Sequence, residues 1–228
     1  MATTQRYLLN PRKMPRQARS AATVEAIHEA TIQVLLTEGP SRLTTTKVAE
    51  RAGVAVGTMY QYFPQKQALI FAVVQRHLGL IAEAVEDACG RLQGQTIAVM
   101  SDGLAASYLA AKTHNIEASR ALYAAASELE VPDIAGDMSR RIYAALRALL
   151  ASSRDGRFDD LDTVTFILQQ ALSGTVRAVL EMEGGPTPAA LDMLGSQLPL
   201  LCRAYLDATS SLAGIGALPQ PVACATCA

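Results

Sequence analysis

Apolar residues recur every three or four positions along most of this chain, which is the spacing of amphipathic helices. Gly39-Pro40 and Gly53 stand where the first two of these helices end, and Thr44 or Thr45 can cap the start of the second. The pattern predicts four helices in the first third of the chain: residues 18–37, about 45–52, about 56–62, and a longer one that follows Pro64.

Beyond Gly94 the helical spacing continues, and the last two predicted helices, over residues 159–183 and 187–212, carry broad apolar faces. Apolar residues seven positions apart in the last helix favour packing against a second copy of the chain. The dimer seam is predicted at Leu168, Leu172, Val176, Leu191, Leu194, Leu198, Leu201 and Tyr205. Small residues beside them, Ala171, Ser173, Gly174 and Ala178, permit close helix approach. No run alternates apolar and polar residues between hairpin turns, so no strand is predicted.

The composition is that of a globular protein. Half of the 228 residues are hydrophobic and 18% are charged, which is too apolar for a disordered chain. The longest uninterrupted apolar run, Ala68 to Val74, is much shorter than the ~18 residues of a membrane span. Four scattered cysteines do not make a disulfide framework, and no apolar segment follows the basic N-terminus. A reducing cytoplasm is therefore the expected location.

The near-neutral total charge hides a division of the chain. Residues 1–80 hold ten bases and four acids, a balance of +6, whereas residues 81–228 carry a balance of −7. Five of the ten bases lie within the first nineteen residues, without an acid among them. This distribution predicts a flexible basic arm over residues 1–17 and a head that meets a polyanion, followed by a body that does not.

The stretch from Leu43 to Leu69 is the most informative part of the chain. Two short helices joined at Ala52-Gly53-Val54 form the pattern of a helix-turn-helix, whose second helix lies in the major groove of DNA. Gly57 allows close approach of the backbone, and the Gln61 amide can pair with a base edge. The stretch resembles the DNA-binding head of the TetR family of bacterial transcriptional regulators at Val48, Ala49, Ala52-Gly53-Val54, Gly57-Thr58, Tyr60, Tyr62-Phe63, Lys66 and Leu69.

The resemblance implies a role for individual residues of the head. Thr45 and Thr46 would touch phosphate or base, Tyr60 would bind the DNA backbone, and Lys66 would hold a phosphate. The groove would be read by Val56, Gly57, Thr58, Gln61 and Tyr62. Two positions depart from the family pattern, because Ala55 and Gln65 stand where a capping Ser, Thr, Asp or Asn is frequent.

Other motifs in the chain carry little chemistry. Glu25-x-x-His28 matches half of a di-iron signature, but the chain has no second copy, so no metal is predicted. Cys224-x-x-Cys227 is interpreted as part of a passive, disordered tail over residues 214–228. No catalytic set of nucleophile, base and acid is recognisable and no cofactor is predicted. The chain is therefore interpreted as a protein without enzymatic activity.

The resemblance also implies a ligand cavity among the middle helices. Its candidate lining consists of Met100, Tyr108, His114, Tyr123, Met138, Tyr143, Phe166 and Gln170, although simple core packing is an alternative for each. The predicted fold is all-α, with a helix-turn-helix head over residues 18–65 and a ligand-binding and dimerisation domain over residues 66–213. The predicted function is a homodimeric regulator, most simply a repressor, that binds a palindromic operator in double-stranded DNA. A small, largely apolar effector would release it.

Two other classes of protein remain open at this point. A helical carrier or enzyme would use the cavity without the head. A nonspecific nucleic-acid binder would owe its affinity to Lys and Arg alone and would ignore DNA sequence.

Overall fold

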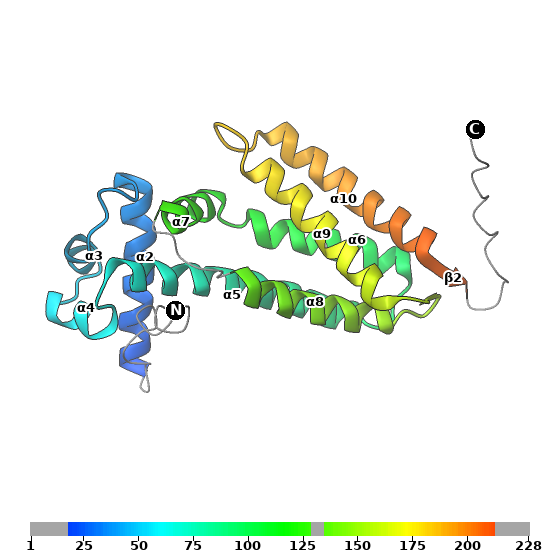
Figure 1. Cartoon of the computed structure of the whole chain (residues 1–228), viewed down its shortest axis with the longest axis horizontal. Coiled ribbons are helices and arrows are strands. Elements are labelled where there is room, and N and C mark those ends of the chain that lie inside the picture. Colours follow the sequence, from blue (N-terminus) through cyan, green and yellow to red (C-terminus); the bar gives the residue numbers. More distant parts are fainter. Residues whose placement is uncertain (1–17, 129–134, 213–228) are drawn as a thin grey trace, which may run out of the picture.

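The computed structural model describes residues 18–128 and 135–212, and this part of the chain is almost entirely helical (Figure 1). Its helices are α2 (Ala18–Glu38), α3 (Thr45–Arg51), α4 (Val56–Tyr62), α5 (Lys66–Leu92), α6 (Ile97–Thr113), α7 (Ile116–Glu128), α8 (Ala135–Ala151), α9 (Leu161–Leu180) and α10 (Pro188–Thr209). The all-α fold with an N-terminal helix-turn-helix is confirmed. The predicted basic arm at residues 1–17 and the predicted tail at residues 214–228, with Cys224 and Cys227, lie outside the described residues.

The prediction that the chain has no strands is wrong for two short segments. β1 (Gly156–Phe158) pairs antiparallel with β2 (Ser210–Leu212), with Gly156 opposite Leu212. Each strand has three residues, which is too short for an alternating pattern to be recognised in the sequence. A Cβ atom at Gly156 would lie 2.2 Å from a methyl group of Ile97, so this ribbon packs directly on the start of α6.

The local signals that start and end the helices of the head agree with the sequence. Thr44 is the cap of α3, because its hydroxyl accepts a hydrogen bond from the backbone N–H of Lys47. Ala55 and Gln65 precede α4 and α5 without a side-chain capping bond. Gly53 ends the helix-turn with a φ of +65°, a backbone conformation that favours glycine.

A first hydrophobic cluster holds the head together. Ile27, Val48, Met59 and Phe63 contribute from the three helices and the residue after α4, each no more than 1% exposed. The N-terminal half of α5 closes this cluster. Helix α7 also reaches into it through Leu122 and Ala125, which are fully buried, and in Figure 1 α7 lies beside the upper end of α2. The head core is thus built partly from a helix that follows it by fifty residues or more.

A second cluster forms the body, where α5, α6, α8, α9 and α10 pack together. Met100, Leu104, Leu146 and Leu172 are among its buried residues. Figure 1 shows α5 running from the head along the length of the body, so that one helix belongs to both clusters. By length and composition α5 could also cross a membrane, but its apolar side chains are largely buried inside the protein, as in a core helix.

Candidate DNA-binding surface and ligand site

The turn between α3 and α4 fixes how α4 is presented. The backbone N–H of Gly53 donates to the carbonyl of Glu50 at 3.1 Å, and that of Val54 donates to the carbonyl of Ala49 at 3.0 Å. Met59 points from α4 into the head core with its side chain fully buried. The opposite face of α4 is therefore left on the outside of the molecule.

Several of the predicted DNA contacts lie on this outer face. Val56 is 42% exposed and Tyr60 is 47% exposed, while Gly57 and Gln61 are exposed beside them. No atom of residues 18–128 or 135–212 lies within 4 Å of the position that a Cβ would take at Gly57, so the backbone there is open to a close approach. Thr46 on α3 is also exposed, and Thr58 is half-buried. We call Thr46, Val56, Gly57, Tyr60 and Gln61 the recognition face.

Three of the predicted contacts have a different environment. Tyr62, predicted to read the groove, is only 8% exposed and packs against Phe63 with ring centroids 6.4 Å apart, so it is a core residue here. Thr45 is buried, and its hydroxyl donates to the Tyr60 hydroxyl at 3.2 Å, so its observed partner is Tyr60. Lys66 is half-buried and its Nζ donates to the carbonyl of Pro40 at 2.6 Å, which ties α5 to the loop after α2.

The bases of the head are partly engaged within it. Lys47 pairs with Glu38, and Arg76 pairs with Glu25 at 2.5 Å. Arg51 donates to the Gln33 side chain at 2.8 Å. Such contacts between partly exposed groups contribute little to stability, so these cations remain available to an anionic surface.

His28 is a buried polar residue of the head core. It is 8% exposed, its ring lies 5.9 Å from that of Phe63, and neither ring nitrogen has a hydrogen-bond partner in the described part of the chain. Burial, together with the charge of Arg76, lowers the pKa of His28 to about 4, while Glu25 opposes the shift. His28 is thus neutral near pH 7 and behaves as a core side chain. Among the described residues no group of three His, Cys, Asp or Glu side chains is placed to hold a metal ion.

Most residues of the predicted dimer seam are buried within one protomer. Leu168, Leu172, Val176, Leu194 and Leu198 are each at most 1% exposed and pack inside the body of one protomer. Leu191 and Tyr205 are half-buried, and Leu201 is 40% exposed. The seven-residue step therefore marks the face of α10 that packs on its own protomer. The exposed apolar side chains of these two helices, which we call the outer face, are Phe166, Ile167, Met193, Leu200 and Leu201.

The predicted ligand residues divide into two groups. Those at the surface are His114, Tyr143, Phe166 and Gln170; of these Tyr143 is half-buried with its hydroxyl on Asp162. His114, Phe166 and Gln170 are exposed and therefore do not line an interior cavity. The interior group is Met100, Tyr108, Tyr123 and Met138; of these Met100 and Tyr108 are at most 3% exposed, and Tyr123 and Met138 are half-buried.

A cluster of polar side chains surrounds Tyr123 where α5, α6 and α7 meet. His77 shares a hydrogen bond of 2.8 Å with the hydroxyl of Ser119, and its ring meets that of Tyr123 edge-on at 6.5 Å. The Nζ of Lys112 donates to the Tyr123 hydroxyl at 3.4 Å and lies 5.7 Å from the centre of its ring. Burial lowers the pKa of Lys112, and the charge of Arg177 lowers it further.

Lys112 is not among the residues predicted from the sequence to bind a ligand, although its position in the chain carries a signal. Lys112 stands four residues after Tyr108 and so shares the inner face of α6 with it. A lysine on an apolar stripe is unusual, because lysine is rarely buried without a partner. Its exposed fraction is 9%.

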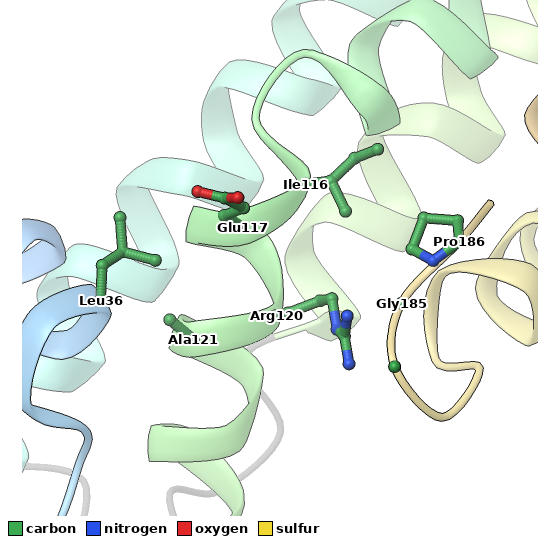
Figure 2. Close-up of a pocket in the computed structure, with 8 residues that line it drawn as sticks. Leu36, Ile116, Glu117, Arg120, Ala121, Gly185 and Pro186 are labelled. Carbon is green, nitrogen blue, oxygen red and sulfur yellow. The ribbon is translucent and has the colours of Figure 1, made fainter. Parts of the chain in front are cut away.

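An open pocket of about 750 Å³ lies between the head and the body. Leu36 of α2 stands on one side, the N-terminal half of α7 forms the floor, and the loop Gly184–Pro186 between α9 and α10 stands opposite (Figure 2). The Arg120 side chain extends from α7 toward this loop, and a Cβ at Gly185 would collide with its guanidinium. None of the predicted ligand residues lines this pocket.

Two models of protein families match the chain, one over the head and one over the body. Residues 27–73 match the family model described as bacterial regulatory proteins, tetR family, and residues 96–206 match the one described as tetracyclin repressor-like, C-terminal domain. Two curated relatives come from Bacillus subtilis. The HTH-type transcriptional regulator YvdT is 33% identical over 81 residues, and the fatty acid metabolism regulator protein is 31% identical over 61 residues. These matches span 39% and 31% of the relatives' lengths, and 36% and 27% of this chain.

Solved structures share the fold over most of the chain. A protein from Mesorhizobium loti described as a TetR-family transcriptional regulator has a TM-score of 0.71 at 16% identity, covering 86% of this chain and all of that one. The fatty acid degradation regulator FadR from Bacillus halodurans has a TM-score of 0.61 at 18% identity, covering 83% and 96% of the two chains. The multidrug binding protein EbrR, complexed with imidazole, has a TM-score of 0.55 at 20% identity, covering 78% and 93%.

Proposed function

Because the chain belongs to the TetR family of bacterial transcriptional regulators, we propose that it is a cytoplasmic homodimeric repressor that a small effector releases from a palindromic operator. The observation that carries the DNA-binding part is the recognition face. The Gln61 amide can pair with a base edge, the Val56 side chain suits a thymine methyl group, and Gly57 permits close approach of the backbone.

The contacts within the head support different DNA-binding roles for its side chains. Gln61 and Val56 are exposed on α4 and would read bases. Tyr60 is held by the Thr45 hydroxyl and would donate to a phosphate at a fixed position. Lys66, tied to Pro40, would contribute its charge to the phosphate backbone from the start of α5.

Two copies are needed to read two half-sites. We propose that the outer face forms the dimer interface, in place of the buried residues of the predicted seam. Five large apolar side chains that are each at least 40% exposed make a surface that a partner would cover. For heads bound on one face of DNA, the half-sites would be about 34–36 Å apart.

Helix α7 supports the proposed response to an effector. Leu122 and Ala125 on α7 are part of the head core, while Ser119 and Tyr123 of the same helix contact α5 and α6. A ligand that shifts α7 would change the packing of the head, and a small difference in affinity between two packings shifts the population. Relatives named as a regulator of fatty acid metabolism and as a multidrug binding protein fit an apolar effector.

The test is a selection of bound duplexes from a random DNA library at ~0.15 M salt, where nonspecific phosphate attraction is already weakened. The wild-type protein is expected to enrich one palindrome. Gln61→Ala should relax the preference at one position in each half-site. Gln75→Ala, an exposed glutamine of α5 away from the recognition face, is the matched control and should select the wild-type sequence.

Other outcomes of the selection point to the other classes. Retention of DNA without a shared motif, with affinity that falls steeply with salt, identifies a nonspecific binder. No retention under any condition would contradict the proposal and would leave a helical binding protein or enzyme that uses the body alone.

A further inference from the structure

Lys112 is a buried cation that has no anionic partner among the described residues. It lies in the last turn of α6 and is 9% exposed, and none of the ion pairs among the described residues includes it. Its ammonium has one hydrogen-bond acceptor, the Tyr123 hydroxyl at 3.4 Å, and part of one aromatic face. An ammonium has three donors, so two are left without a partner among the described residues. Burying such a group is costly, which calls for a compensating role.

The groups around Lys112 leave one positive charge uncompensated. Arg177 and Glu181, on and just after α9, are the charged side chains whose fields reach it, and they pair with each other at 2.7 Å. His77 lies near but burial lowers its pKa, so it is neutral near pH 7 and adds no charge. His114 is close enough to act on His77 and is exposed. A single excess charge matches a monoanion better than a dianionic phosphate.

The surroundings also offer neutral donors and apolar surface. Tyr108 lies one turn before Lys112 on the same face of α6 and is 3% exposed. Burial, with a smaller contribution from the Tyr123 phenol, raises the pKa of Tyr108. Ser101, two turns further back on that face, is fully buried, and its hydroxyl has no hydrogen-bond partner within the segments that the structure describes. The inner face of α6 thus carries a hydroxyl, a phenol and an ammonium in a row within an otherwise apolar core.

Neither Lys112 nor Tyr123 lines the pocket of Figure 2, but residues close to the cluster in the chain do. Ile116, on the pocket wall, follows Lys112 by four residues, and Gly184, on the opposite wall, follows Glu181 by three. Arg120 adds a second cation without an ion pair among the described residues, and Glu117 is the acid in the lining. The apolar part of the lining is Leu36, Ile116 and Pro186.

We propose that the effector is an amphiphilic monocarboxylate whose carboxylate binds Lys112 and the Tyr123 hydroxyl, with its apolar body among Tyr108, Ile116 and the loop Gly184–Pro186. The proposal rests on the proposed function, because it names the chemical class of the effector. Lys112 and Tyr123 donate hydrogen bonds to the carboxylate, and the binding is noncovalent. Tyr123 sits on α7, so the same contact pulls on the helix that enters the head core.

The experiment compares carboxylates with their amides, which have the same shape without the charge. Thermal unfolding of the full chain is followed at pH 7.5 with octanoate and octanamide, decanoate and decanamide, and phenylacetate and phenylacetamide. At a concentration a hundredfold above Kd, a bound carboxylate should raise the Tm by about 5–10 °C. The paired amide should give less than about a fifth of that shift.

Variants separate a binding role of Lys112 from a structural one. Lys112→Met should weaken carboxylate binding at least about tenfold and abolish the difference between acid and amide. Without ligand its Tm should be unchanged or higher, because a buried uncompensated charge has been removed. Lys112→Gln repeats the comparison with a polar side chain if the methionine variant does not fold. Lys47→Met makes the same substitution at a surface ion pair of the head and should leave the carboxylate shift intact.

Three results would overturn the inference. One is the absence of a carboxylate shift in the wild type over the whole panel. Another is a carboxylate shift that persists in both Lys112 variants. The third is a ligand-free Tm that falls by several degrees in both variants while the difference between acid and amide remains. Operator binding is measured separately on the selected duplex. Sequence-specific binding without any response to carboxylates removes the inference alone, whereas carboxylate binding without operator selection removes the proposed function alone.

Discussion

Lowering the pH from 7 to 5 should destabilise the head through His28. Burial holds the pKa of His28 at about 4 in the folded protein, against an ordinary value of 6.5. As the pH falls below 6.5 the unfolded chain takes up a proton that the folded chain does not, so the unfolded state gains in stability. The contribution of His28 is therefore fully present above pH 6.5 and is lost as the pH falls toward 4.

The two pKa values fix the size of this effect. Between pH 7 and pH 5 the loss in the free energy of unfolding is about 2 kcal/mol from His28 alone, a large part of the 5–15 kcal/mol typical of a native domain. Burial also lowers the pKa of His77, which adds a loss of the same sign. The effect of His28 must therefore be isolated by substitution.

Urea unfolding followed by far-UV circular dichroism at pH 7, 6 and 5, at one protein concentration, measures it. His28→Leu replaces the imidazole with an apolar side chain of similar size, and its stability should fall between pH 7 and pH 5 by about 2 kcal/mol less than that of the wild type. His77→Gln is the matched control that retains His28 and should keep most of the wild-type dependence. Identical pH profiles for wild type and His28→Leu would refute the reasoning, because His28 would then titrate alike in the folded and unfolded chains.

Two further predictions concern the dimer and the turn. Leu200 is 59% exposed, so Leu200→Asp should give a folded protein that sediments as a monomer and no longer binds the operator. Leu198 is 1% exposed, so Leu198→Asp should unfold the body. A dimeric Leu200→Asp variant would exclude Leu200 from the interface. Gly53→Ala should lower the free energy of unfolding by about 1 kcal/mol, because φ there is +65°. Gly57→Ala, at a helical position with open space around it, should instead stabilise the head by a similar amount while weakening operator binding. Thermal unfolding measures both changes in stability, and equal Tm changes for the two variants would contradict this prediction.

The parts of the fold that local chemistry decides could be predicted from the sequence. The Thr44 cap, the glycine turn at Gly53 and the helix over residues 56–62 depend on neighbours in the chain, and the structure has them where the pattern indicated. The side of a helix that faces the core is harder to predict. Helices α9 and α10 have apolar residues on two sides, and the sequence does not say which side meets the protomer's own core. Leu198 lies on the inner side and Leu200 on the outer, two positions apart.

The same limit explains why the candidate ligand site was predicted only in part. Tyr108 and Tyr123 could be predicted as candidate ligand residues of the middle helices. His77 and Ser119 are 42 residues apart in the chain and meet only because α5 and α7 pack against each other. Lys112 could be placed on the inner face of α6 by its spacing, yet its lack of an ionic partner is a property of three helices together. Long-range contacts of this kind are fixed by packing rather than by local pattern.

In the proposed mechanism, helix α7 would link the candidate ligand site to DNA binding through its packing alone. Leu122 and Ala125 are fully buried in the head core, and Tyr123 between them carries the hydroxyl that Lys112 contacts. A close-packed core does not deform smoothly, so a ligand that moves Tyr123 by a fraction of an ångström must favour a different packing of Leu122 against α2 and α5. The coupling acts in both directions: whatever factor the effector takes from operator affinity, the operator takes from effector affinity. Leu122→Ala should therefore weaken this coupling while leaving the contact between Tyr123 and Lys112 in place, which effector titrations with and without the selected duplex would measure.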